Sequence, residues 1–197
     1  MSNDGVNSNR RRFLTVATAV VGGVGGVFAA VPFLASMQPS ARTKALGGPI
    51  EMDISKLEPE QQIIGKWRGK PIWVIRRNND EIAHLKRDTG NLRDPNSEVD
   101  HQPAYAKNSY RSIKPEYLVL IGICTHLGCS PEYFPPGAPN DLGSHWYAGF
   151  FCPCHGSRFD LAGRVFKDVP APTNLVVPPY HYVSDTIIQI GVDKGAA

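Results

Sequence analysis

Two short runs of this chain hold every cysteine that it contains. The first run reads CTHLGC at residues 124–129, and the second reads CPCHGS at residues 152–157. Each run offers one cysteine and one histidine at ligand spacing, Cys124 with His126 and Cys152 with His155. Two thiolates and two imidazoles are the ligands of a [2Fe–2S] cluster in which histidines bind one of the two irons. The two runs therefore predict a mixed-ligand iron–sulfur centre.

The chemistry of such a centre follows from the charge of its ligands. Two neutral imidazoles in place of two thiolates remove two negative charges, so the cluster accepts an electron more readily than an all-cysteine cluster does. Imidazole also carries an ionisable N–H group remote from the metal, and its charge changes near neutral pH. A centre of this kind can take an electron and a proton together from a quinol.

Two other interpretations use the same residues less completely. A zinc site could take two cysteines and two histidines, but it would leave Cys129 and Cys154 unexplained. A pair of disulfides would leave both histidines of the runs without a role. Only the iron–sulfur interpretation accounts for all six residues. The other histidines are expected to be structural: His84, His101, His145 and His181.

The two runs resemble the cluster-binding boxes of the Rieske iron–sulfur subunit of the cytochrome bc complex, the quinol–cytochrome c reductase. The resemblance extends from the N-terminus to about Val192 and implies thiolate ligands at Cys124 and Cys152 and imidazole ligands at His126 and His155. The further roles that it implies are a disulfide between Cys129 and Cys154, a hydrogen bond from Ser157 to a cluster sulfide, an apolar tip residue at Leu127 and a covering proline-rich loop at Val169–Pro172.

Two features depart from the family's pattern. Members of higher potential have a tyrosine two residues after the serine, where this chain has Phe159. The missing phenol hydroxyl predicts a lower reduction potential. The stretch between the boxes, Ser130 to Phe151, is also long for the family.

The N-terminal part of the sequence predicts a membrane anchor. No charged residue lies between Arg12 and Arg42, and residues 13–34 are almost wholly apolar. As a helix they span about 33 Å, enough for a hydrocarbon core of roughly 30 Å. A cleaved signal peptide is the alternative, but Leu34-Ala35-Ser36 offers only a poor cleavage site. We therefore expect one uncleaved transmembrane helix.

Three arginines, Arg10 to Arg12, stand immediately before the anchor. The positive-inside rule places residues 1–12 in the cytoplasm. The run also looks like a bacterial twin-arginine export signal. Such a signal implies a single-pass protein of the inner membrane with its head in the periplasm. Export in the folded state suits a domain that receives its cofactor before translocation.

Composition is consistent with one small anchored domain. Residues 35–48 are small or turn-prone and are expected to form a linker, which the resemblance implies is a hinge. Residues 49–197 have the length of one domain and are expected to be the Rieske [2Fe–2S] domain. The net charge of +3 gives no indication of nucleic-acid binding. Four cysteines together with an export signal fit a compartment that permits disulfides.

The head is expected to be mainly β, an antiparallel β-sandwich with the cluster loops at its tip. The expected strands cover residues 61–67, 71–77, 117–123, 180–184 and 186–192, with a short helix over 80–87. The apolar run Tyr117–Ile123 leads directly into the first box, and Phe150-Phe151 enters the second. Residues 88–114 are polar and are expected to be an excursion rather than a domain.

The resemblance also implies the function. The chain is expected to be a subunit of quinol–cytochrome c reductase in which His155 meets quinol and His126 is the other exposed imidazole. A cytochrome b subunit and a c-type cytochrome are the expected partners, in a dimeric complex. The alternatives are the Rieske subunit of another periplasmic oxidoreductase, such as an arsenite oxidase, and a soluble Rieske ferredoxin. The anchor and the extra cysteines argue against the ferredoxin, and associated b and c haems would exclude the arsenite oxidase.

Overall fold

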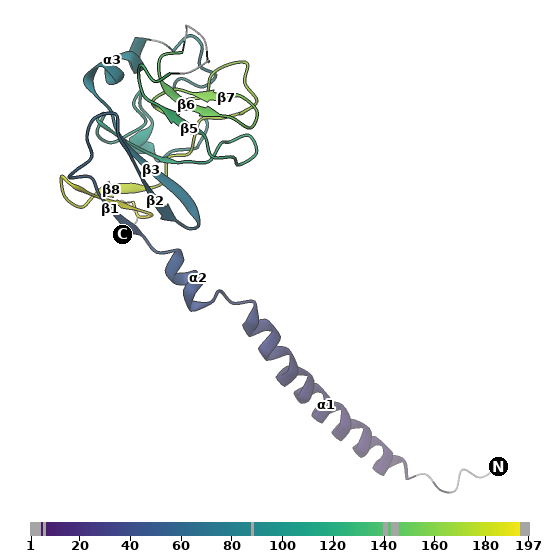
Figure 1. Cartoon of the computed structure of the whole chain (residues 1–197). Helices are drawn as coiled ribbons and strands as arrows, with labels where there is room; N and C mark the ends of the chain where they lie inside the picture. Colours follow the sequence, from purple (N-terminus) through teal and green to yellow (C-terminus); the bar gives the residue numbers. More distant parts are fainter. Residues whose placement is uncertain (1–4, 6, 88, 140–141, 143–145, 194–197) are drawn as a thin grey trace. The chain divides into compact units, whose positions relative to one another are not determined.

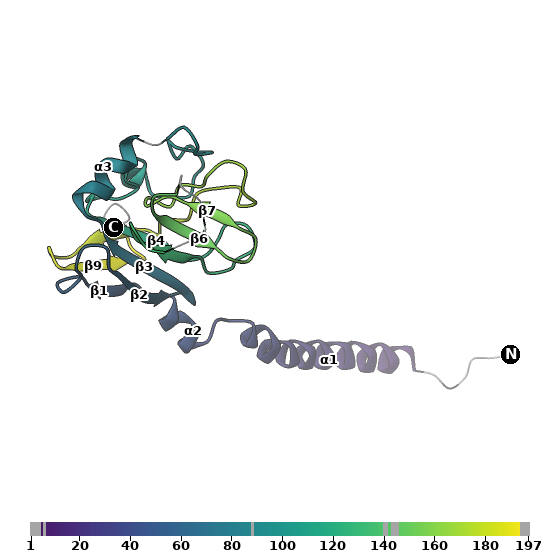
Figure 2. The ribbon, with the colours of Figure 1, turned by 45° about the horizontal axis from the view of Figure 1, so that its top comes forward.

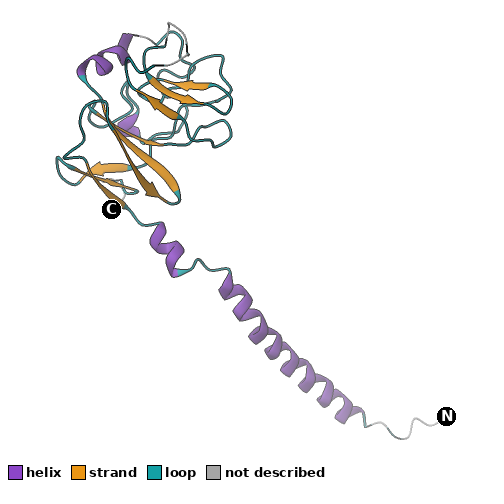
Figure 3. Ribbon diagram, viewed as in Figure 1, coloured by secondary structure: helices purple, strands orange, loops and turns teal. Residues whose placement is uncertain are grey.

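The computed structural model of the protein describes residues 5, 7–87, 89–139, 142 and 146–193. The chain divides into two compact units, residues 1–45 and residues 46–197. The first unit contains a long helix, and the second contains the strands of the described chain (Figures 1 and 3). This division separates an apolar helix from a β-rich head.

The long helix is α1, Ser8–Ser36. It begins at Asn7, whose side-chain oxygen accepts hydrogen bonds from the backbone N–H groups of Asn9 and Arg10, both at 3.1 Å. The helix is long and apolar enough to cross a membrane, and none of its residues is buried within the protein. The expected anchor over residues 13–34 lies inside it. The segment expected to be a linker contains a short helix, α2, Ala41–Leu46.

The head contains three antiparallel sheets of three strands each among its described residues. The first sheet has the order β1 (Ile50–Asp53), β9 (Ile187–Ile190), β8 (Tyr180–Tyr182). The second has the order β2 (Gln62–Trp67), β3 (Lys70–Arg76), β4 (Tyr117–Ile121). The third has the order β5 (Glu132–Phe134), β6 (Gly149–Cys152), β7 (Ser157–Phe159). The expected mainly β, antiparallel head is confirmed.

The sheet β2-β3-β4 is the middle layer of the head (Figures 1 and 2). Successive residues of β3 point to opposite faces, yet residues 72–75 are all buried. On one face, Trp73 stacks on Phe150 of β6 with ring centroids 5.4 Å apart. On the other face, Gly65 of β2 lies so close to Met52 of β1 that a Cβ atom there would be 2.8 Å from the sulfur. The middle sheet therefore supports the sheet that carries the second box.

The strands expected over residues 61–67 and 71–77 pair as a hairpin, which closes with two residues, Arg68 and Gly69. Their φ angles are +50° and +77°, as a type I′ turn requires. The strand expected to reach Ile123 ends earlier, at Ile121. The next residue, Gly122, packs against the Trp73 ring, where a Cβ atom would lie 2.1 Å from a ring carbon. The chain leaves the sheet at this point and enters the first box.

Helix α3, Asn79–Arg87, confirms the helix expected over residues 80–87. A reciprocal capping pair begins it: the Asn78 side chain accepts from the Glu81 N–H at 2.8 Å, and Glu81 accepts from the Asn78 N–H at 2.6 Å. The following residues, 89–114, contain a short 3₁₀ helix, η1, Ala104–Ala106, and pack on the head. They form an excursion of the same domain, as expected.

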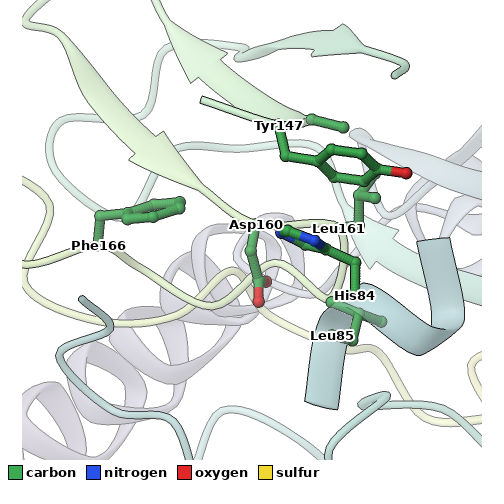
Figure 4. A pocket seen from close by; sticks show the side chains of 7 residues that line it. His84, Leu85, Tyr147, Asp160, Leu161 and Phe166 are labelled. Carbon is green, nitrogen blue, oxygen red and sulfur yellow. The ribbon is translucent and has the colours of Figure 1, made fainter. Parts of the chain in front are cut away.

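The far end of the long stretch between the boxes rests on α3. A small apolar cluster joins Leu85 of α3 to Ala148, Leu161 and Ala162. Beside it, the His84 ring stacks on the Tyr147 ring with centroids 4.0 Å apart. All of these side chains except Ala162 line a small cavity together with Asp160 and Phe166 (Figure 4). His84 thus has the structural role expected of it, whereas His145 lies outside the described residues.

Candidate metal centre

Two strand ends deliver the boxes to one place. Box 1, residues 124–129, follows β4 and leads to β5, and box 2, residues 152–157, connects β6 to β7. The first and last residues of box 2, Cys152 and Ser157, face each other across the β6–β7 pair. Because β5 also pairs with β6, one sheet holds the exit of box 1 beside box 2.

Each box folds into the same kind of turn. The Gly128 N–H donates to the Cys124 carbonyl at 3.1 Å, and the Gly156 N–H donates to the Cys152 carbonyl at 2.9 Å. Both glycines have positive φ, +85° and +77°. Glycine adopts this conformation without the steric cost that a side chain brings. The turn curls each box back on its first cysteine.

A disulfide joins the two boxes between Cys129 and Cys154. The Cys129 carbonyl also accepts a hydrogen bond of 2.7 Å from the Cys124 N–H, which closes box 1. Cys124 and Cys152 are not in a disulfide, and both are buried. The sulfurs of Cys129, Cys152 and Cys154 lie within 4.8 Å of one another, but two of the three are bonded together. Cys124 and Cys152 remain as the available thiolates.

The two box histidines meet edge to face. The rings of His126 and His155 have centroids 4.7 Å apart and an interplanar angle of 88°. His126 is half-buried, and its Nδ1 atom is buried without a hydrogen-bond partner in the part of the chain that the structure describes. A buried polar atom normally has a partner, because leaving it unpaired is costly. A metal bound to this nitrogen would remove the cost.

The environment of the Cys124 thiol also fits a cation-binding role. Burial raises its pKa, and the nearby Cys152 thiol raises it further, while the His126 N–H and the Ser157 hydroxyl act in the opposite direction. Two buried thiolates side by side are unfavourable without positive charge between them. Metal ions supply that charge and deprotonate the thiols that bind them. The donors present therefore fit a cluster with two thiolate and two imidazole ligands.

The proline-rich loop, residues 169–173, is fastened to both boxes. The Ala171 N–H donates to the Ser157 Oγ at 3.0 Å, and the Thr125 hydroxyl donates to the Thr173 carbonyl at 2.7 Å. Ser157 and Ala171 are fully buried. Sequence reasoning missed Thr125, since nothing local marks a partner 48 residues away. Its position between two proposed ligands is the one local signal that could have drawn attention to it.

The two ends of the site differ in exposure. Leu127, expected at the tip, has 71% of its surface exposed. His155 is exposed, whereas His126 is half-buried and so is only partly exposed. An external proton donor can therefore reach His155 more readily than His126.

Sequence comparisons give the same picture over the whole chain. Residues 1–40 match the family model "Ubiquitinol-cytochrome C reductase Fe-S subunit TAT signal", and residues 96–181 match "Rieske [2Fe-2S] domain". The "Ubiquinol-cytochrome c reductase iron-sulfur subunit" of Allochromatium vinosum is 62% identical over all of this chain and 95% of that relative. The protein of the same name from Blastochloris viridis is 46% identical over 96% of this chain and 97% of its own length. A solved chain described as "Hyperthermophilic respiratory Complex III" is 25% identical, with a TM-score of 0.46 over 88% of this chain and 98% of that chain.

Proposed function

Because this chain belongs to the family of Rieske iron–sulfur subunits of ubiquinol–cytochrome c reductase, we propose that its two boxes hold the [2Fe–2S] cluster that takes an electron from quinol. The proposed ligands are the thiolates of Cys124 and Cys152 and the imidazoles of His126 and His155. The observation that carries this assignment is the buried, unpartnered His126 Nδ1 beside the His155 ring and the two free cysteines.

The bound cluster supplies one-electron redox chemistry, and the surrounding residues control its access and its protons. His155 is the exposed imidazole, so its outer ring nitrogen is placed to accept the proton of a quinol hydroxyl. The exposed side chain of Leu127 offers an apolar surface for docking at a quinol site. The Ser157 hydroxyl donates toward the sulfurs of the site and favours the reduced state.

The partners follow from the family. In the proposed cycle the head receives an electron from quinol at a cytochrome b subunit, and the second electron of the quinol goes to a b haem. The head then passes its electron to a c-type cytochrome, and His155 releases its proton on reoxidation. Residues 35–48 would provide the hinge for this movement, and the whole complex is proposed to be dimeric.

The proposed topology places residues 1–12 in the cytoplasm and residues 13–34 across the bacterial inner membrane. Residues 49–197 then form the Rieske domain in the periplasm. The length of α1 supports a membrane span, and the arginines near its start support this orientation. The match of residues 1–40 to a twin-arginine signal model supports export of the folded head. A spanning helix that stays uncleaved would serve as both signal and anchor.

Purification of the native membrane complex through a C-terminal tag on this chain tests the proposal. We expect b and c haems to co-purify. We also expect quinol to produce the Rieske-type electron paramagnetic resonance (EPR) signal of a reduced cluster and to cause reduction of cytochrome c. His155→Ala should abolish both, while His181→Ala, a change on β8, should leave them intact. Isolation of this chain without haem subunits, or with a molybdenum enzyme, would contradict the proposal.

A further inference from the structure

Three arginines are fully buried in the head. Arg77, Arg111 and Arg164 each have 1% or less of their surface exposed. A guanidinium group keeps its charge in almost any environment, so burying it requires many hydrogen-bond acceptors. The partners of these three side chains show what the burial accomplishes.

Arg77 and Arg111 bind the segment that follows β7, the strand after box 2. The Arg77 Nη1 donates to the Leu161 carbonyl at 3.0 Å. The Arg111 Nη1 donates to the carbonyls of Ala162 and Gly163, at 3.1 Å and 3.3 Å. All three carbonyls lie just beyond the end of β7 at Phe159. Backbone dipoles rather than carboxylates therefore compensate these two charges.

Arg111 also binds the segment that follows the proline-rich loop. Its Nη2 donates to the Leu175 carbonyl at 2.7 Å, and Leu175 follows Thr173, the residue that binds Thr125 of box 1. The Arg111 backbone has a φ of +49°, a conformation that disfavours side chains. Gly163 permits the approach, because a Cβ atom there would lie 3.2 Å from the Arg111 Nη1. The backbone at Arg111 is thus strained in the conformation that buries its guanidinium group between the segment after β7 and the segment after the proline-rich loop.

The buried charges of this region do not cancel. Among the described residues, the buried carboxylates are Asp160 and Glu81, and Asp160 is paired with Arg164 at 2.7 Å. Three buried arginines therefore stand against two buried carboxyl groups. Burial lowers the pKa of Arg77 and of Arg111 to about 10 in each case, so both remain cationic at neutral pH. The region behind the boxes therefore carries a positive excess.

A continuous apolar core adjoins the boxes. Phe159, Val165 and Leu120 have no exposed surface and belong to the same core cluster as Cys124 and Cys152. In such a medium, charges interact over longer distances than they do in water. A fixed positive charge favours the more negative of two redox states, which here is the reduced cluster.

We propose that Arg111, together with Arg77, raises the reduction potential of the cluster by placing buried positive charge behind its loops; this inference rests on the ligand set proposed above. As a general estimate, a unit charge at a distance on the order of 10–15 Å, at an effective dielectric of about 20, changes an equilibrium constant by roughly an order of magnitude. Each arginine should therefore favour reduction severalfold. The excursion over residues 88–114 gains a role as the element that supplies Arg111.

The test is an EPR-monitored redox titration of the full chain in its membrane complex. We expect Arg111→Gln, which keeps a hydrogen-bond donor but no charge, to disfavour cluster reduction severalfold and lower the midpoint potential. Arg111→Lys keeps the charge and should restore most of that potential, even if its melting temperature is lower. Lys66→Gln, on the exposed side of β2, removes one surface charge and should leave the potential unchanged.

A second variant should shift the midpoint potential in the opposite direction. It makes the test independent of whether the Arg111 variants fold. Asp160→Asn keeps the oxygen that accepts from Ala162 and removes a buried negative charge, so it should raise the midpoint potential. Equal shifts in Arg111→Gln and Arg111→Lys, or no rise in Asp160→Asn, would overturn the inference. Absence of a Rieske signal in the unmodified complex would instead overturn the proposed function, so the two failures are distinguishable.

Discussion

The Thr125 hydroxyl donates a hydrogen bond of 2.7 Å to the Thr173 carbonyl and so joins box 1 to the proline-rich loop. The Ala171 N–H joins the same loop to box 2 through the Ser157 Oγ, at 3.0 Å. The disulfide between Cys129 and Cys154 joins the boxes to each other. Three segments distant in sequence thus form one closed frame, and each connection can be removed separately.

Removal of the Thr125 hydroxyl should weaken this frame. Thr125→Val keeps the side-chain shape and loses a hydrogen bond worth about 1 kcal/mol. For a domain of this size, such a loss should lower the melting temperature by about 2–4 °C. Differential scanning calorimetry of the cluster-loaded protein measures the change. Thr186→Val, in the exposed β8–β9 connection, is the matched control, and an equal effect of both variants would contradict a special role for Thr125.

Loss of the disulfide should release the cluster before it unfolds the head. The bond closes a loop between cysteines 25 residues apart, and such a cross-link stabilises a fold by about 3 kcal/mol. We expect the double variant Cys129→Ser/Cys154→Ser to lose its visible absorption at a lower temperature than the unmodified protein. Alkylation followed by mass spectrometry checks the premise. Two free thiols at these positions in native protein would show that the bond does not form.

Phe159→Tyr should raise the midpoint potential. The Phe159 ring is fully buried in the core that also contains Cys124 and Cys152. A phenol hydroxyl that donates to a ligand sulfur would withdraw electron density and stabilise the reduced state. One hydrogen bond of about 1 kcal/mol corresponds to roughly 40 mV for a one-electron couple. Redox titration decides the matter, with Phe134→Tyr on β5 as control; an unchanged or lower potential would mean that the hydroxyl misses the sulfur.

Glu81→Gln should stabilise the head in a pH-dependent way. Burial raises the pKa of Glu81, so ionisation of this side chain in the folded protein costs stability. This cost is absent below the ordinary pKa of the group and grows as the pH rises through the folded value. Glutamine keeps an oxygen for the Asn78 N–H but carries no charge. The melting temperature of the variant relative to the unmodified protein should therefore increase as the pH rises above the ordinary pKa of a glutamate side chain. Glu51→Gln, on exposed β1, should show no such trend, and a difference independent of pH would refute the assignment.

The sequence predicted the parts of the structure that depend on local patterns. The family, the mainly antiparallel β fold, the helix of membrane-spanning length and the class of cofactor are confirmed. The hairpin at Arg68 and Gly69 and the helix capped by Asn78 were also predictable, because their signals lie within a few residues. The ligand assignments and the domain boundaries stay predictions.

The remaining features arise from contacts between distant segments. Nothing near Thr125 indicates that its hydroxyl meets Thr173, and the disulfide pairing came from the resemblance rather than from spacing. Arginine is usually exposed, so burial of Arg77 and Arg111 contradicts the ordinary expectation from residue type. Only the packing of residues 89–114 against the segment after β7 explains it. Likewise, the half-buried state of His126 depends on how two separate boxes close on each other.

EPR spectroscopy of two reduced variants, Cys152→Ser and Cys154→Ser, tests the central claim most directly. These cysteines lie two residues apart, yet the first is assigned as an iron ligand and the second as half of a disulfide. We predict that Cys152→Ser abolishes the Rieske signal, whereas Cys154→Ser keeps the same g values in whatever fraction of cluster remains. A full signal with two irons per chain in Cys152→Ser would contradict the proposed ligand set.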